Sequence, residues 1–331
     1  MQKIYPVCVI GGGSAGTMAT IRSVLNNDET ILFPGNAKHK KKSRAFWVSK
    51  VENMPSHLEY KKGIEEPNKL SLEWLQGSPF KEKLHWKKGV GVDQVTKNSD
   101  GLFVISATDG ETYLAQYLIL CTGVMDVQPE INGSIQPILP YANVQLADYC
   151  LRCDGHHVLN KKIGVIGHDT SALWVAIMLH ERYQTTSTVV FTNGKQMKYD
   201  DETKKLASLY GIQVIEDNIV GIEGNAKLHE LRSFALSNGN YIEVEYVFIA
   251  LGMIVYNELA KSLGAELDQR GFVVTDTKGK TNITGLYVAG DLRANAKKQI
   301  YTAWDHAVDS ADDINILLRR EKRNKLLTQT P

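Results

Sequence analysis

A glycine-rich turn directly after the first apolar run constrains the fold of this chain more than any other feature. Residues 5–10 have the pattern of a buried strand, and the turn Gly-Gly-Gly-Ser-Ala-Gly follows at residues 11–16. A helical pattern at residues 15–25 and a second strand at residues 30–33 come next. The sequence therefore predicts a βαβ opening, and with it a parallel sheet.

The spacing of Gly11, Gly13 and Gly16 matches the dinucleotide-binding fingerprint in its required strand-turn-helix context. In that fingerprint the first glycine permits the tight turn, the second lets the backbone approach a pyrophosphate, and the third allows close helix packing. An acidic residue is expected about twenty positions on, to hold the ribose. Here the second strand ends in Phe33, Pro34 and Gly35, so the ribose contact must come from elsewhere or from backbone.

The same theme returns in the middle of the chain. A strand at residues 162–166, a turn at Gly167, a helix at residues 171–182 and a strand at residues 188–192 form a second nucleotide-type βαβ unit. The remaining predicted elements are a helix around residues 70–74, strands at 101–108, 112–120, 241–250 and 285–289, and a last helix at 301–318. We expect an α/β protein with two Rossmann-like, doubly wound domains. The predicted boundaries are residues 1–126, an inserted domain at 127–251, and a return to the first domain at 252–331.

Composition excludes several classes of protein. The chain has 331 residues, enough for two domains, and its net charge of +1 provides no overall field for nucleic acid. No apolar run reaches membrane-spanning length. Four cysteines are too few for a secreted disulfide scaffold, which indicates a reducing, cytoplasmic compartment. Cys8 and Cys121 lie in apolar strands and are interpreted as buried small hydrophobes.

The other two cysteines, Cys150 and Cys153, form a CxxC motif whose spacing suits a reversible disulfide. Arg152, His156 and His157 could favour the thiolate by their charge. The two cysteines and two histidines could instead ligate zinc, but adjacent histidines usually point apart and no second ligand pair completes a site, so no metal is expected. Asp154, before Gly155, could be a simple turn residue.

Three further segments resemble the thioredoxin reductase family of flavoproteins. They are Val51-Glu52-Asn53-Met54-Pro55, Cys121-Thr122-Gly123, and Ala289-Gly290-Asp291 followed by Gln299. The resemblance implies FAD as cofactor, a homodimer, and a thioredoxin-like protein or small dithiol as substrate. It also implies that Cys153 faces the flavin, Cys150 attacks the partner, and Asp154 donates or accepts a proton. The residues implied at the FAD site are Gly11, Gly13, Ser14, Ala15, Gly16, Asn53, Thr122, Gly123, Gly290, Asp291, Gln299 and Ile300, with Gln299 and its neighbours at the ring.

The inserted domain departs from this family. Asp169 stands where a glycine should let the backbone approach the pyrophosphate of NADPH, and its carboxylate would repel that phosphate. The His-Arg-Arg cluster that would bind a 2′-phosphate is replaced by Phe191-Thr192-Asn193-Gly194-Lys195. We expect a retained fold that has lost NADPH, with weak residual NADPH binding as the alternative.

Without NADPH, electrons need another route. A basic loop could dock ferredoxin or flavodoxin as donor through complementary charge. Alternatively, electrons could pass from a dithiol to oxygen, or the chain could be a redox sensor without turnover. A second basic group near the C-terminus has the composition of a cationic helix end. Tyr301, Trp304 and His306 also depart from the family; core packing is the expected role of these rings, with shielding of the flavin ring as the alternative. The basic loop comprises Lys38, Lys40, Lys41, Lys42 and Arg44, and the second group Arg319, Arg320, Lys322, Arg323 and Lys325.

Overall fold

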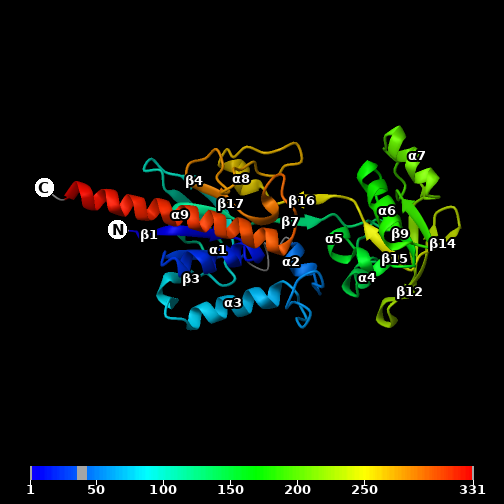
Figure 1. Ribbon diagram of the computed structural model, residues 1–331, viewed down its shortest axis with the longest axis horizontal. Helices are drawn as coiled ribbons and strands as arrows, with labels where there is room; N and C mark the ends of the chain where they lie inside the picture. The colour runs from blue at the N-terminus through cyan, green and yellow to red at the C-terminus, as the bar shows by residue number, and fades with distance from the viewer. Residues whose placement is uncertain (1, 36–42, 330–331) are drawn as a thin grey trace. The chain divides into compact units, whose positions relative to one another are not determined.

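The computed structural model describes residues 2–35 and 43–329, which form two compact units (Figure 1). The terminal unit contains the described parts of Met1–Trp47, Lys62–Met125 and Val255–Pro331. The inserted unit contains Val48–Lys61 and Asp126–Ile254. The predicted domain boundaries at residues 126/127 and 251/252 stay predictions, and the packing groups Val48–Lys61 with the inserted unit.

The terminal unit is built on a seven-stranded sheet with the order β3-β2-β1-β6-β5-β4, in which β17 also pairs with β6. The central strand β1 (Ile4–Ile10) runs parallel to β2 (Thr30–Phe33) and β6 (Thr112–Leu120). Strand β6 is nearly all apolar toward its end because helices and loops cover both faces of the sheet there. The other strands are β3 (Leu84–Trp86), β4 (Val92–Lys97), β5 (Phe103–Ala107) and β17 (Leu286–Val288).

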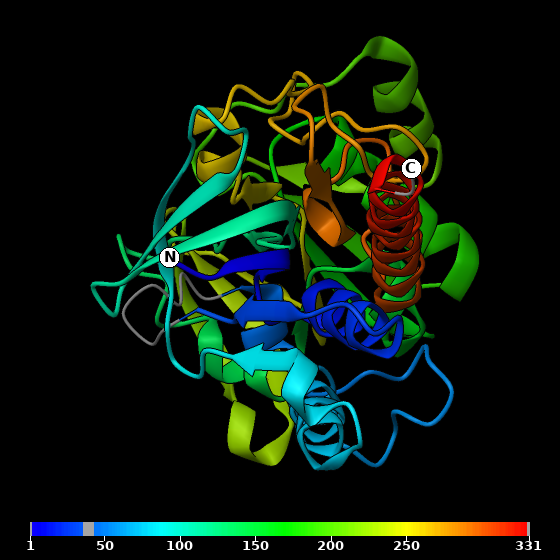
Figure 2. The same cartoon turned by 90° about the vertical axis from the view of Figure 1, so that its left-hand side faces the viewer.

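Helices α1 (Ser14–Leu25) and α9 (Ile300–Gln329) lie side by side against one face of this sheet (Figures 1 and 2). Alanines at their contact with the sheet, including Ala19 and Ala307, allow close approach. An Arg22–Asp312 ion pair with Nε–Oδ1 at 2.6 Å joins the two helices. The unit's other helices are α2 (Arg44–Trp47), α3 (Glu65–Gly77), α8 (Glu258–Ser262) and 3-10 turns at Lys81–Lys83 and Gly290–Leu292.

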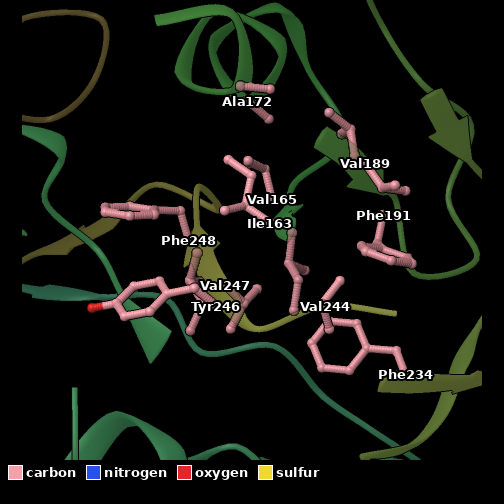
Figure 3. Close-up of a cluster of buried hydrophobic side chains, with 14 of the residues drawn as sticks. Ile163, Val165, Ala172, Val189, Phe191, Phe234, Val244, Tyr246, Val247 and Phe248 are labelled. Atoms are coloured by element: carbon pink, nitrogen blue, oxygen red, sulfur yellow. The ribbon is translucent and has the colours of Figure 1, made fainter. Parts of the chain in front are cut away.

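The inserted unit contains a parallel five-stranded sheet with the order β11-β10-β9-β15-β8. Its apolar core lies between this sheet, helix α6 and an antiparallel three-stranded sheet, β12-β13-β14 (Figure 3). The strands are β8 (Ala147–Asp148), β9 (Lys162–Ile166), β10 (Ser187–Phe191), β11 (Gln213–Ile215), β12 (Ile219–Asn225), β13 (Glu230–Leu236), β14 (Tyr241–Glu243) and β15 (Tyr246–Ile249). The helices are α4 (Leu139–Asn143), α5 (Leu151–Asp154), α6 (Thr170–Tyr183), α7 (Asp201–Leu209) and 3-10 turns at Gly155–Val158 and Ala226–Leu228. A two-stranded sheet of β7 (Val124–Asp126) and β16 (Met253–Val255) contains two of the points where the chain passes between the units.

The α/β class and both βαβ units are confirmed. The single strand expected at residues 241–250 is wrong, because the chain changes sheets inside it. Strand β14 pairs with β13, whereas β15 joins the parallel sheet beside β9, and the Glu245 amide donates to the Lys162 carbonyl at the crossing. The last helix continues beyond the predicted residue 318, to Gln329. Within residues 2–35 and 43–329, no helix is long and apolar enough to cross a membrane.

Candidate functional site

Three of the predicted cofactor motifs meet at one edge of the terminal sheet. The parallel register pairs Leu120 of β6 with Ile10 of β1 on one side and with Val288 of β17 on the other. Each strand therefore ends beside the next, and the segments starting at Gly11, Cys121 and Ala289 leave the sheet together. Open α/β sheets bind their ligands at this carboxyl edge.

Glycine is required where these segments touch. Gly11 has φ +117°, and a Cβ there would lie 2.2 Å from the Cys121 carbonyl oxygen. A Cβ on Gly290 would lie 2.8 Å from the Cβ of Ala15, at the start of α1. Thr122 is held by a 2.6 Å hydrogen bond from its hydroxyl to the Tyr256 carbonyl. The backbone of all three motifs is thus packed into one cradle.

The start of α1 at Gly13 has free space around it, in contrast to the close contacts at Gly11 and Gly290. A Cβ on Gly13 would meet no heavy atom of the described residues within 4 Å. The first turn of α1 has no acidic residue and no side-chain cap among the described residues. Exposed amides at a helix N-terminus attract phosphate, so this cradle fits the pyrophosphate of FAD.

Asp291 of the last motif forms an ion pair with Arg44. Asp291 lies 3.6 Å from Arg44, and both side chains are largely buried. Arg44 was predicted to belong to a basic surface loop, which is wrong for this residue because it pairs with Asp291. Lys38, Lys40, Lys41 and Lys42 lie outside the described residues.

The start of α9 holds the remaining predicted cofactor residues. Gln299 is buried and directly precedes α9, and Ile300 begins that helix. Lys298, which sequence reasoning missed, donates to the Arg293 carbonyl at 2.6 Å, and burial lowers its pKa to about 8. A basic residue next to an expected flavin site is the signal that could have identified it.

A pocket of about 470 Å³ opens where the 293–297 loop meets α9. Burial, and next the charge of Arg293, lowers the pKa of His306 in its wall to about 4, so this histidine is neutral near pH 7. Tyr301, also in the wall, is 46% exposed, so the expectation that it packs in the core is wrong. Trp304 and His306 are half-buried.

In the inserted unit, Cys150 and Cys153 form a disulfide with their Cα atoms 5.3 Å apart. Cys150 is the N-cap of the short helix α5, and the Cys153 amide donates to its carbonyl at 3.0 Å. A carboxylate oxygen of Asp154 and both sulfurs lie within 4.8 Å of one another. Arg152 points into solvent, while the two cysteines are half-buried. The arrangement places a carboxylate next to a half-buried disulfide.

Glu52, which comes from Val48–Lys61, lies beside this disulfide segment and was not predicted as a site residue. Its Oε2 is 2.9 Å from His156 Nε2 and 2.7 Å from His157 Nε2. The expectation that the adjacent histidines point apart is therefore wrong: one carboxylate bonds both. Three possible metal ligands converge here, Glu52, His156 and His157, yet the prediction that no metal binds is not tested and stays a prediction.

His157 extends this contact into the sheet. Its Nδ1 lies 2.8 Å from the Tyr246 hydroxyl and 3.2 Å from Asp148 Oδ2, and the Tyr246 hydroxyl donates to the same Asp148 oxygen. The hydrogen bond to Asp148 raises the pKa of His157, and Glu52 adds to this against the effect of burial. The hydrogen bond from His157 is the main cause that lowers the pKa of Glu52. Burial, then Asp148, raises the pKa of Tyr246. The sequence shows the two histidines after the CxxC, but most of their partners are remote in sequence.

The other cysteines behave as predicted. Cys8 and Cys121 are free thiols buried in the terminal unit, and burial raises the pKa of both. Thiolate chemistry is therefore confined to the CxxC pair.

The start of α6 differs from the start of α1. Asp169 is the N-cap of α6, and its Oδ1 accepts from the Ala172 amide at 3.1 Å and from the Ser171 hydroxyl at 2.6 Å. A carboxylate thus accepts from an amide that a phosphate at this helix N-terminus would need. Beyond β10, Lys195 and Lys198 are exposed.

Comparison with known proteins gives consistent results. The model of the pyridine nucleotide-disulphide oxidoreductase family matches residues 5–311. A thioredoxin reductase of Listeria innocua is 28% identical over 313 residues, covering 91% of this chain and 90% of that protein. The thioredoxin reductase structure from Streptococcus pyogenes has a TM-score of 0.81 at 21% identity and covers 97% of this chain and 100% of its own. The putative thioredoxin reductase TrxB structure from Bacillus anthracis has a TM-score of 0.79 at 24% identity, covering 96% and 99%. The two structures show a shared fold.

The family match spans nearly the whole chain, including the glycine cradle in the terminal unit and the disulfide in the inserted unit. The chain therefore belongs to the pyridine nucleotide-disulphide oxidoreductase family, as an FAD-dependent disulfide oxidoreductase that is similar to thioredoxin reductases.

Proposed function

We propose that this enzyme moves electrons between FAD and the Cys150–Cys153 disulfide and exchanges that disulfide with a thioredoxin-like protein. The observation that carries the proposal is the half-buried disulfide at the start of α5 with the Asp154 carboxylate next to its sulfurs. Bound FAD supplies a two-electron acceptor or donor for a dithiol. Relatives named thioredoxin reductase support thioredoxin as the kind of partner.

The chain's own residues would then have distinct tasks. Amides around Gly13 hold the pyrophosphate, while Thr122, Gly123, Gly290 and Asp291 line the rest of the cradle. Asn53, Gln299 and Ile300 remain proposed contacts of the cofactor.

At the disulfide, Cys150 attacks the partner, Cys153 exchanges electrons with the flavin, and Asp154 moves the proton. A thiolate is the attacking species, so the proton on Cys150 must leave before the exchange.

We further propose that NADPH is not the electron source. Asp169 supports this, because its carboxylate accepts from the first-turn amide and hydroxyl of α6 and would repel a pyrophosphate there. The alternative is weak NADPH binding, for which the exposed Lys195 and Lys198 are candidate cations. Docking of ferredoxin or flavodoxin rests on the loop at residues 38–42, which lies outside the described residues.

The same observation favours a second candidate, a dithiol oxidase. With no nicotinamide as donor, a small dithiol could reduce the Cys150–Cys153 disulfide, and oxygen could then take the two electrons and two protons as hydrogen peroxide. Peroxide formed in step with dithiol consumption in air would favour the oxidase over the reductase.

Anaerobic reduction of the FAD-loaded protein by dithiothreitol tests the proposed function. We expect rapid bleaching of the flavin absorbance, and loss of the rapid phase in Cys150→Ser and Cys153→Ser. The control is Cys8→Ala, which removes a buried thiol of the other unit and should bleach as the wild type does. Equal bleaching in the wild type and both CxxC variants would refute exchange through this disulfide.

A further inference from the structure

A chain of hydrogen-bonded side chains lies close to the Asp154 carboxylate that stands next to the disulfide. It runs from Glu52 through His157 and Tyr246 to Asp148, and we call these four residues the buried relay. All four belong to the inserted unit, although they come from four separate segments. Figure 3 shows the Tyr246 ring at the margin of the apolar cluster, with its hydroxyl directed away from that cluster.

The hydrogens of the buried relay can be assigned from its partners. A protonated His157 donates from Nε2 to Glu52 and from Nδ1 to the Tyr246 oxygen, while Tyr246 donates its own proton to Asp148. Every donor then has an acceptor. If Nδ1 loses its proton, it can only accept, and Tyr246 must choose between His157 and Asp148. Loss of the Nδ1 proton therefore changes the group to which the Tyr246 hydroxyl can donate.

Asp154 connects the buried relay to the disulfide. Ligand atoms of Asp148, Asp154 and His157 lie within 4.8 Å of one another, and so do those of Asp154, Cys150 and Cys153. Opposite charges at such distances shift protonation by one or more pH units. The cation on His157 thus acts on the carboxylate that stands next to the sulfurs.

The groups that face His157 come from every element around it. Three carboxylates lie close to it: Glu52, Asp148 and Asp154. The His156 ring centroid is 4.3 Å from that of His157, and Lys161 lies over the Tyr246 ring at 5.1 Å. With three carboxylates around one imidazole, the protonated ring is the form that keeps them ionised together.

We propose that His157 is a positioning residue: held protonated by the buried relay, it offsets the negative charge of Asp154 beside the Cys150–Cys153 dithiol, so that a cysteine can pass its proton to Asp154 and remain as a thiolate. The inference rests on the proposed function of this dithiol. In the step itself the S–H bond of a cysteine breaks, its proton forms an O–H bond on Asp154, and a thiolate remains. No electrons are transferred, and no additional reactant is needed.

The pH dependence of thiol alkylation tests the inference. The FAD-loaded protein is reduced, freed of reductant and treated with iodoacetamide between pH 5 and 9, and the rate at Cys150 is followed by mass spectrometry. The midpoint of this rate profile reports the pKa of the Cys150 thiol, because the thiolate is the reactive form. His157→Gln should shift that midpoint upward by about one pH unit, because a cation is lost amid carboxylates.

His156→Gln is the matched control. This residue also bonds Glu52 and stands next to His157, but it is exposed and the bonds to Tyr246 and Asp148 are made by its neighbour. Its profile should coincide with that of the wild type. A purely structural role for His157 would lower the thermal stability without moving the alkylation midpoint.

Tyr246→Phe keeps the test decisive if His157→Gln does not fold. It removes the hydroxyl but keeps the ring, and an upward shift smaller than that expected for His157→Gln supports the buried relay. Unchanged midpoints in the folded variants, or an equal shift in His156→Gln, would overturn the inference. Alkylation needs no flavin turnover, so a failure of the proposed function would be seen separately, as absent bleaching by dithiothreitol.

Discussion

The two nucleotide-type units of this protein differ by one carboxylate at the start of their first helix. Both begin with a strand, a turn and a helix, but α1 opens on Gly13 with free space, whereas α6 opens on the carboxylate of Asp169. A helix N-terminus can hold either a side-chain cap or a phosphate on the same amides. The residue at the cap therefore decides which unit is expected to bind a dinucleotide.

Asp169→Gly should restore the fingerprint in the inserted unit and tighten NADPH binding by about tenfold or more, since it removes a repelling charge. Loss of the cap to glycine should cost only a few tenths of a kcal/mol. Asp200→Gly is the matched control, because Asp200 caps α7 in the same way, through the Thr203 amide. Titration with NADPH, followed by protein fluorescence, measures the NADPH affinity of Asp169→Gly and of Asp200→Gly. Equal affinity in the wild type and Asp169→Gly would contradict this role.

Gly13→Ala should weaken FAD binding by tenfold or more without disturbing the fold. The added methyl meets no heavy atom of the described residues within 4 Å, but it would enter the space expected for the pyrophosphate. Gly77→Ala is the control, because its methyl also meets nothing among those residues. The apo proteins should unfold at closely similar temperatures, and only Gly13→Ala should lose flavin during gel filtration. Full FAD retention in Gly13→Ala would place the pyrophosphate elsewhere.

At the scale of elements, α9 is anchored to the loop that joins α1 to β2. Arg319 donates to Asp28 Oδ1 and to the Asn26 carbonyl, both at 2.7 Å, and Asn315 donates to Asp28 Oδ2 at 2.8 Å. Asp28 is buried, and burial raises its pKa despite these partners. The basic group near the C-terminus is thus divided: Arg319 is part of the packing, while Arg320, Lys322, Arg323 and Lys325 are exposed.

Arg319→Ala should lower the free energy of unfolding by about 1–3 kcal/mol near pH 7, because a buried carboxylate loses a charged donor. Since the folded pKa of Asp28 is raised, the folded state binds more protons, and stability from this group falls as pH rises above about 4. Losing Arg319 should raise that pKa further, so the deficit should be smaller at pH 5 than at pH 7. Urea unfolding at both values, with Arg320→Ala as a near-neutral control, checks this. A deficit equal at both values would refute the electrostatic cause.

Local patterns predicted the elements that are continuous in sequence, such as β1, α1 and the second βαβ unit. They did not predict the buried relay, because Glu52 is about a hundred residues from His157 and only the fold brings them together. Arg44 shows the same limit: in the sequence it follows a run of lysines, and only the fold reveals that it pairs with the distant Asp291. The strand expected at residues 241–250 failed because alternation cannot show where a chain changes sheets.

At the scale of the whole molecule, chemistry is divided between two units. Three of the expected cofactor motifs lie in the terminal unit, and the disulfide lies in the inserted unit together with the Val48–Lys61 segment. The proposed exchange therefore requires the complete chain, and its direction depends on which donor the inserted unit accepts. We propose that electrons pass through the dithiol and that the inserted unit does not use NADPH.

Anaerobic stopped-flow mixing of the FAD-loaded protein with either NADPH or dithiothreitol tests that claim most directly. We predict that dithiothreitol bleaches the flavin rapidly and only when both CxxC cysteines are present, whereas NADPH leaves the flavin oxidised. Rapid bleaching of the wild type by micromolar NADPH would contradict the account, because Asp169 would then not exclude the nicotinamide cofactor.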